Sequence, residues 1–192
     1  MHGTVGEAHK VVVCGWHRTG TTSLHVALRA LGYRVHGFDR ELMFGLMNGK
    51  RRRIWKAAGH SDAFRDFPWC LLYKEFDERF PGTKFILTKR DPEGWLESYK
   101  RHHDSIGKSP SHISPVHTWV YGGLTTPHGN EQAFVDRFTR HNTEALAYFG
   151  SRQGSDVLVF DVFSGDGWNE LCGFLGRERV DGPFPSEESA IL

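Results

Sequence analysis

Short runs of apolar residues recur along the chain and predict buried strands. Residues 10–15 (KVVVCG), 83–90 (TKFILTKR) and 156–161 (DVLVFD) are such runs, and residues 33–39 (YRVHGFD) predict a shorter one. Runs that are almost continuously apolar, rather than alternating, are typical of parallel strands that are covered on both faces. The pattern therefore predicts a mainly parallel sheet in the interior of the protein.

Between these runs the apolar residues return with the spacing of an α-helix. The first such face follows the first strand and ends at Gly32. Its apolar residues are Leu24, Ala27, Leu28 and Leu31. Asp91 is a good N-cap for a later helix, with Pro92 at its first position. In chain order, the other predicted helices are residues 40–58 (irregular), 68–80, 91–103, about 134–150 and 167–176.

The alternation of strands and helices predicts an α/β fold with three layers, in which helices cover both faces of the central sheet. Residues 1–192 suit a single domain without internal repeats, and we expect its core at about 10–176 between loose termini. The tail after Val180 is polar and contains prolines. Residues 104–130 show little periodicity, and a connection that long is usually functional or mobile.

Composition narrows the class of protein. A formal net charge of +1 argues against nucleic acid or a membrane surface as the partner. The first ten residues lack the apolar stretch of a secretion signal, and no run approaches the length of a membrane span, so we expect a cytoplasmic protein. The distant Cys14, Cys70 and Cys172 fit reduced, buried thiols. The 12 histidines show no metal-ligand spacing, and we assign no metal.

The first predicted strand runs into a glycine-rich turn that opens the first helix. Gly15 and Gly20 keep the G-x4-G frame of a phosphate-binding loop, whose backbone N–H groups and helix dipole attract an anion. That loop normally continues with Lys, but Thr21 stands there, and Arg18 lies inside the loop. The hydroxyl donors of the loop are Thr19, Thr21, Thr22 and Ser23.

The missing lysine bears on the chemistry. In kinases and NTPases it reaches the β- and γ-phosphates, while Mg²⁺ joins the next Ser or Thr. Thr21 cannot replace that lysine. Sulfuryl transfer moves a formally neutral SO₃ unit without a bridging metal. It therefore needs the charge of that lysine less than phosphoryl transfer does. The forked guanidinium of Arg18 suits a tetrahedral oxyanion.

Two motifs resemble those of the sulfotransferases that use 3′-phosphoadenosine 5′-phosphosulfate (PAPS). The sequence HRTGTTSL, residues 17–24, is similar to the family's loop for the 5′-phosphosulfate, usually P-[KR]-[ST]-G-T-T. The family's motif for the 3′-phosphate has an Arg at a strand end and a Ser eight residues later. KRDPEGWLES supplies these as Arg90 and Ser98. The resemblance spans most of residues 10–176.

The resemblance implies a P-loop NTPase-like sulfotransferase fold. It also implies an enzyme that moves a sulfuryl group from PAPS to a hydroxyl or amine and releases 3′-phosphoadenosine 5′-phosphate (PAP), with no metal required. The acceptor would be a small molecule or a carbohydrate. Arg18 would also be catalytic, because it would neutralise charge as PAP leaves. The donor-binding residues would be Arg18, Thr19, Gly20, Thr21, Thr22, Ser23, Arg90 and Ser98.

The chain departs from the family pattern at three points. His17 replaces the usual proline of the loop, and Ser23 stands where many cytosolic members carry a Trp that packs on adenine. The R-K-G-x-x-G-D-W-K segment near the C-terminus of those members is absent. We therefore expect adenine to pack on another wall and the shell around the 3′-phosphate to differ.

The family commonly places its general base just ahead of a proline, before the strand that carries the 3′-phosphate Arg. Asp66, in RDFPW, stands two residues before Pro68 and 24 before Arg90. Many members use His in that segment, so His60 is the second candidate and His17 the third. The structural alternative is that Asp66 caps a helix that begins near Pro68.

Two other functions stay open. One is a small-molecule or nucleotide kinase with a degenerate loop, which the glycine frame and Asp161 after the last strand favour. The other is a non-catalytic protein that binds PAP. Thermal stabilisation by PAP or by ATP with Mg²⁺ separates the transferase from the kinase, and turnover separates it from the binding protein.

Several residues carry both a structural and a functional interpretation. Lys50–Arg53 (KRRR) is either a solvated basic face or part of a grip on an anion. His141 lies on the apolar face of the long predicted helix, and we expect a buried core histidine. We expect Trp95 and Trp168 to pack in the interior.

The acceptor pocket is expected in the two irregular stretches, residues 40–66 and 104–130, because variable loops on an α/β scaffold usually carry specificity. Four aromatic residues there either offer an apolar or sugar-stacking surface or pack in the core. They are Phe44, Trp55, Trp119 and Tyr121.

Overall fold

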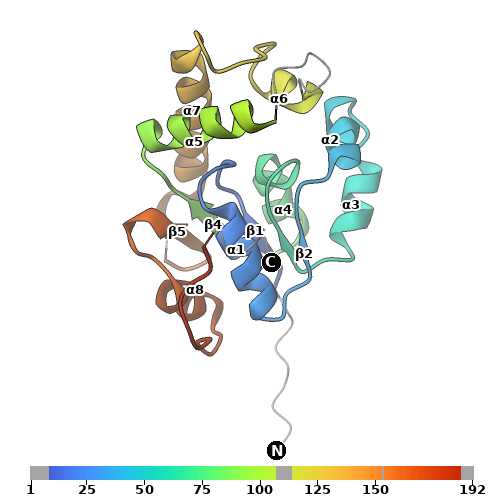
Figure 1. The fold of residues 1–192 in the computed structure, drawn as a ribbon. Helices are drawn as coiled ribbons and strands as arrows, with labels where there is room; N and C mark the ends of the chain where they lie inside the picture. The colour runs from blue at the N-terminus through green and yellow to red at the C-terminus, as the bar shows by residue number, and fades with distance from the viewer. Residues whose placement is uncertain (1–8, 107–113, 153, 187–192) are drawn as a thin grey trace, which may run out of the picture.

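The computed structural model describes residues 9–106, 114–152 and 154–186 (Figure 1). Within these residues, five parallel strands form one sheet in the order β2-β3-β1-β4-β5. The strands are β1 (Val11–Val13), β2 (Val35–His36), β3 (Ala63–Phe64), β4 (Lys84–Thr88) and β5 (Val157–Phe160). The first strand of the chain thus lies in the middle of the sheet.

Helices connect the strands and cover the sheet. They are α1 (Thr21–Ala30), α2 (Arg40–Met47), α3 (Arg52–Ala58), α4 (Tyr73–Arg79), α5 (Pro92–Ser105), α6 (Pro115–Val120), α7 (Glu131–Phe149) and α8 (Trp168–Leu175). The described part of the chain also has the short 3₁₀ turns η1 (Trp69–Leu71), η3 (Gly150–Arg152) and η4 (Val162–Ser164). Of the helices in the described ranges, none has both the length and the apolar character needed to cross a lipid bilayer.

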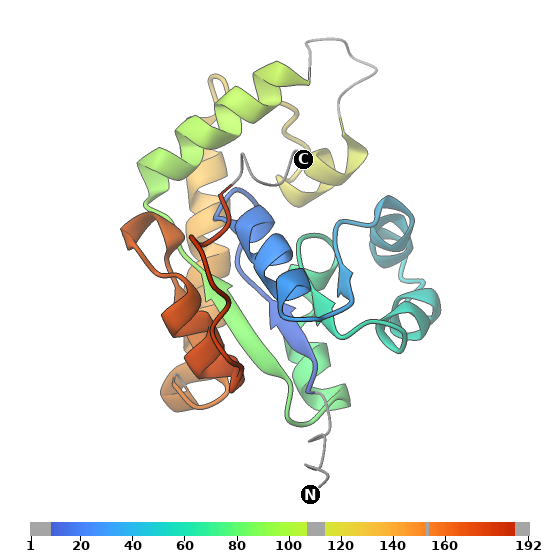
Figure 2. The ribbon, with the colours of Figure 1, turned by 60° about the horizontal axis from the view of Figure 1, so that its bottom comes forward.

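Alternate residues of the strands enter two separate cores. Val11 and Val13 of β1 pack with α1 and α8, whereas Val12 packs with α3, α4 and α7 on the opposite face. Figure 2 shows α1 and α8 on the near side of the sheet and α7 behind it. The predicted three-layer α/β fold is therefore confirmed. The three cysteines are buried and unpaired, as predicted.

A third core lies beyond the carboxyl ends of the strands. It is rich in aromatic residues and joins the loop after β1 to α2, α5, α6 and α7. Its large members include Trp16, Phe67, Trp95, Tyr99, Tyr121, Phe134 and Phe138. In Figure 1, α5, α6 and α7 gather above the sheet on this side. This core fixes the walls around the loop that follows β1.

The structure differs from the predicted elements at several places. Strand β3 was not predicted, and the irregular helix at 40–58 is two helices, α2 and α3. The stretch 104–130 contains helix α6, while residues 107–113 lie outside the described residues.

The tail after Val180 is not loose throughout its described part. Trp168 Nε1 donates a hydrogen bond to the Pro183 carbonyl oxygen at 3.2 Å, and Phe184 packs on Phe160 and Trp168. An aromatic side chain in the tail thus extends the core under α8. The expected loose ends, residues 1–8 and 187–192, lie outside the described residues.

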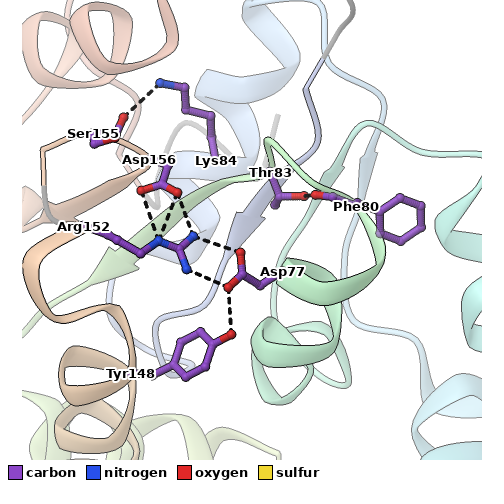
Figure 3. A network of polar contacts seen from close by, with 8 residues as sticks. All are labelled: Asp77, Phe80, Thr83, Lys84, Tyr148, Arg152, Ser155 and Asp156. Carbon is purple, nitrogen blue, oxygen red and sulfur yellow. Dashed lines mark hydrogen bonds and ion pairs between the residues drawn. The ribbon is translucent and has the colours of Figure 1, made fainter.

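An ion-pair network joins α4, η3 and β5 at the amino ends of the strands (Figure 3). The Arg152 guanidinium donates to both carboxylate oxygens of Asp77, at 2.7 and 2.9 Å, and to Asp156 Oδ2 at 2.7 Å. The Tyr148 hydroxyl also donates to Asp77, at 2.7 Å. The hydrogen bonds from Arg152 are the main reason that the pKa of Asp77 lies below its ordinary value.

We expect Arg152→Gln to lower the free energy of unfolding by about 1–2 kcal/mol at neutral pH. A single exposed ion pair contributes about 0.2–1 kcal/mol, and a network of several charges contributes more. The pKa of Asp77 is depressed by folding, so its stabilising effect is present above the unfolded pKa and is lost as the pH falls through the folded pKa. The difference between wild type and variant should therefore shrink in acid.

Urea unfolding in buffers from neutral pH down to about pH 2.5 measures both effects. Arg51→Gln is the matched control, since Arg51 makes one ion pair, to Glu75, at similar exposure. Equal losses for the two variants would contradict the network.

Candidate functional site

The loops that follow β1, β3 and β4 meet at the carboxyl edge of the sheet, where ligands bind in open parallel α/β folds. A cavity of about 770 Å³ opens there. Its lining residues are His17, Arg18, Thr21, Thr22, Phe38, Arg40, Asp66, Phe67, His102, Ile106, Ser114, Pro115 and His117. Residues of the predicted loop thus share one cavity with the predicted base.

Both glycines of the predicted loop are required, Gly20 by its backbone conformation and Gly15 by its close approach to Thr88. Gly20 has a left-handed φ of 86°, and a Cβ there would lie 2.6 Å from Val162. A Cβ on Gly15 would lie 1.8 Å from Thr88 Oγ1. Helix α1 begins without a side-chain cap or an acidic residue in its first turn. Its N–H groups and positive dipole end therefore suit an anion.

Arg18 joins the two predicted donor motifs. Its Nε donates a hydrogen bond to Ser98 Oγ at 3.1 Å, across 80 residues of sequence. Arg90 Nη1 donates to the Arg18 carbonyl oxygen, also at 3.1 Å. Ser98 is buried. The Arg90 guanidinium lies 4.1 Å from the centre of the exposed Phe163 ring.

The four hydroxyl side chains of the loop have different surroundings. Thr21 and Thr22 line the cavity. Thr19 is fully buried, and its hydroxyl bonds the Trp16 carbonyl oxygen and lies 2.5 Å from Thr88 Oγ1. Ser23 is also buried and does not line the cavity. Thr19 and Ser23 thus contribute to the packing of the loop in this structure.

Asp66 follows β3, and its side chain contacts the loop. Its Oδ1 accepts a hydrogen bond from Thr21 Oγ1 at 3.0 Å, and its Oδ2 pairs with Arg65. Arg65 Nε in turn donates to His25 Nδ1 at 3.0 Å. Neither η1 nor α4 has a side-chain cap, so the alternative that Asp66 caps the next helix by its carboxylate is wrong. The carboxylate is positioned at the cavity instead.

Backbone strain coincides with the two residues predicted to react. Within the described residues, Arg18 and Asp66 are the non-glycine residues with positive φ, at 63° and 60°. A side chain in this conformation costs of order 1–2 kcal/mol, and such outliers cluster at functional sites. The surrounding structure must hold both residues against this cost.

The two histidine alternatives for the base lie in different places. His60 is exposed, precedes β3 and does not line the cavity, so the structure does not support it. His17 lines the cavity, and burial holds its pKa well below the ordinary value. Its Nε2 lies 2.6 Å from the Tyr121 hydroxyl, and its ring stacks on His117 at 5.5 Å.

His102 and His117 also line the cavity, although the sequence pattern did not single them out. His117 Nδ1 lies 3.1 Å from the Tyr99 hydroxyl, and burial lowers the pKa of His117 to about 4. His102 is followed by His103 in the helix, and adjacent helical residues point in different directions, so nothing local indicated that His102 faces the cavity. For His117, no local signal existed.

One group within the described residues could hold a metal ion. His103, Asp104 and His128 place possible ligand atoms within 4.8 Å of one another. His128 Nε2 lies 2.8 Å from Asp104 Oδ1, and an ordinary surface ion pair accounts for this contact. None of the three residues lines the cavity.

Several other residues have structural surroundings. The Asp161 carboxylate accepts hydrogen bonds from Phe163 N and Ser164 N and caps η4. His141 is buried, with Nε2 2.7 Å from the Cys14 carbonyl oxygen, as expected for a core histidine. Trp95 and Trp168, both predicted to pack, are buried as well.

Both stretches predicted for the acceptor pocket contribute to the cavity. Arg40 and Asp66 line it from the first stretch, and Ile106, Ser114, Pro115 and His117 line it from the second. The four aromatic candidates Phe44, Trp55, Trp119 and Tyr121 do not line it. Phe38 and Phe67, just outside the first stretch, do. Within the basic run, Lys50 and Arg53 line a separate cavity of about 200 Å³.

The chain matches a known protein and a known protein family. The chain is 33% identical over 110 residues to the Ava biosynthesis cluster protein M of Aspergillus versicolor. That alignment covers 46% of this chain and 41% of the relative, so the chain spans less than half of the relative's length. The sulfotransferase domain family matches residues 10–190. Because this match covers nearly the whole chain, the protein belongs to the sulfotransferase family.

Proposed function

We propose that the protein transfers a sulfuryl group from PAPS to a hydroxyl or amine of a small acceptor and releases PAP. Membership of the family supports sulfuryl transfer in general. The contacts of Arg18 with Ser98 and Arg90 support PAPS as the donor. They bring together a loop suited to a 5′-phosphate and two residues suited to a 3′-phosphate. A donor with both 5′- and 3′-phosphates matches this arrangement.

The residues of the site fit such a donor. The uncapped start of α1 and Arg18 would hold the 5′ end, and Arg90 and Ser98 the 3′-phosphate. Phe163, exposed beside Arg90, is our candidate for the wall on which adenine packs. PAPS supplies the sulfuryl group, with PAP as the leaving group.

Transfer forms a bond between the acceptor oxygen and sulfur. The bond from sulfur to the bridging oxygen breaks, and its electron pair leaves with PAP. Asp66 takes the proton of the acceptor, while Thr21 and Arg65 hold its carboxylate in place. Arg18 stabilises the charge that grows on the bridging oxygen.

The kinase alternative is less well supported. Thr21 stands at the position of the kinase lysine and cannot replace it, and the Asp161 carboxylate caps η4. The name of the relative refers to a biosynthesis cluster, which supports a small-molecule acceptor for this chain. A PAP-binding protein without turnover is distinguished by assay.

Binding of PAP, AMP and ATP with Mg²⁺, measured by thermal shift and calorimetry, tests the donor. PAP should stabilise the protein more than AMP, which lacks the 3′-phosphate. Arg90→Ala should weaken PAP binding by about 10-fold or more, since a hydrogen bond to a charged group contributes about 1.5–3 kcal/mol, and should hardly affect AMP. Ser98→Ala should act in the same direction.

Lys89→Ala is the matched control, because Lys89 is the exposed cation next to Arg90. It should leave both affinities near wild type. Equal weakening of PAP and AMP in Arg90→Ala would remove the 3′-phosphate assignment. Stabilisation by ATP with Mg²⁺ but not by PAP would contradict the donor.

A further inference from the structure

The cavity extends away from the residues that we assign to the 3′-phosphate. Arg90 and Ser98 do not line it, although Arg18 and Thr21 do. The rest of its wall comes from the loop before α2, the segment after β3, the end of α5 and the start of α6. On the proposed function, on which this inference rests, the space beyond the loop is the acceptor site.

Apolar side chains from separate segments form much of this wall. Phe38 and Ile106 are 49% and 39% exposed, which is unusual for large apolar residues at the mouth of a cavity. Phe67 is buried and Pro115 lies in the first turn of α6. A bound apolar molecule would cover surface that water now contacts, and that burial favours binding.

Two histidines of the wall, His17 and His117, add flat rings rather than charge. Burial lowers the pKa of His117 to about 4 and that of His17 well below its ordinary value, so both are neutral near pH 7. The positive charge of Arg40 lies at an exposed position, where water solvates it. Apart from Arg18, which the 5′ end of the donor would occupy, the wall therefore offers little to attract a charged acceptor.

A sugar would find hydroxyl and imidazole partners here, from Thr22, Ser114 and the histidines, but few of the carboxylates and amides that bond two hydroxyls at once. Among the described lining residues there is one carboxylate, that of Asp66, and no amide side chain. Both oxygens of that carboxylate already have partners, Thr21 and Arg65. Sugar hydroxyls buried without partners would lose their bonds to water, and each loss weakens binding.

We propose that the acceptor is an uncharged, flat and largely apolar alcohol or phenol. Its ring lies against Phe38, Phe67 and Pro115, and its hydroxyl reaches Asp66. The cavity volume, about 770 Å³, falls within the range of about 300–1,000 Å³ that is typical of sites for drug-sized ligands.

Calorimetry of the protein saturated with PAP tests this acceptor class, with 2-naphthol, 2-naphthalenemethanol and methyl α-glucoside as probes. Sulfation of each probe from PAPS is measured in parallel. We expect both naphthyl compounds to bind at least about 10-fold more tightly than the glucoside, and to be sulfated. Phe38→Ala should weaken naphthyl binding by about 10-fold without changing PAP affinity.

Trp119→Ala is the matched control, because Trp119 is 48% exposed, like Phe38, but does not line the cavity. It should leave naphthyl binding unchanged. Tighter binding of the glucoside, no binding of either naphthyl compound, or equal effects of the two variants would overturn the acceptor class. If PAP itself fails to bind, the donor proposal fails, and naphthyl binding to the free protein, measured in parallel, still decides the acceptor class.

Discussion

Asp66→Asn should lower the rate of sulfuryl transfer by about 10²–10⁴-fold and leave the affinity for PAP nearly unchanged. The amide oxygen of Asn can still accept the hydrogen bond from Thr21, which lies 3.0 Å from the carboxylate, but the amide cannot take a proton. Loss of the pair with Arg65 should reduce stability by about 1 kcal/mol. Rate and stability therefore separate the chemical role of Asp66 from a structural one.

The measurement is PAP release at saturating PAPS and 2-naphthol, together with urea unfolding of each variant. Asp62→Asn is the matched control. Asp62 also pairs with an arginine, Arg34, whose hydrogen bond lowers the pKa of Asp62 to about 2, but it lies at the opposite end of β3. Its variant should lose stability and keep its turnover. A near-wild-type rate for Asp66→Asn would move the base elsewhere, with His17 and His117 next to be tested.

The second large effect concerns the cation of the loop. Arg18→Ala should lower turnover by about 10²-fold or more, because the charge on the departing bridging oxygen would lose its main partner. Arg18→Lys should recover part of this loss, since it keeps the charge but not the fork that also bonds Ser98. Folding should change little, because Ala at this position has to adopt the same positive φ.

Single-turnover kinetics and thermal unfolding of both variants test this role. Arg29→Ala, which removes an exposed arginine in the last turn of α1, is the control and should behave as wild type. Turnover of Arg18→Ala close to that of wild type would refute the role of Arg18 in transfer.

Elements with strong local patterns were predictable. The valines of β1 form a continuous apolar run, and Gly15 and Gly20 follow in the G-x4-G spacing of a phosphate-binding loop. Asp91 is the N-cap of helix α5 as predicted, because its carboxylate accepts the Gly94 N–H at 2.6 Å. Such features depend on residues within one or two turns of each other.

Strand β3 shows the limit of that argument. Ala63 and Phe64 are too few to produce a periodic pattern, and they form a strand because β1 and β2 pair with them on either side. The position of β3 then delivers Asp66 to the loop. The family resemblance identified Asp66 as a candidate general base. Its contact with Thr21 follows from the order of the strands in the sheet.

The sequence by itself determined the class of fold, and it predicted a glycine-rich loop suited to an anion and the residue types of two motifs for the donor, because these depend on local spacing and on the chemistry of single side chains. Only the tertiary structure decided which residues meet. His117 stacks on His17, and Phe38 and Ile106 share one cavity, although each comes from a different segment. The reason is physical: the docking of α2, α5 and α6 over the sheet is driven by apolar burial, which has no direction of its own and leaves no local signal.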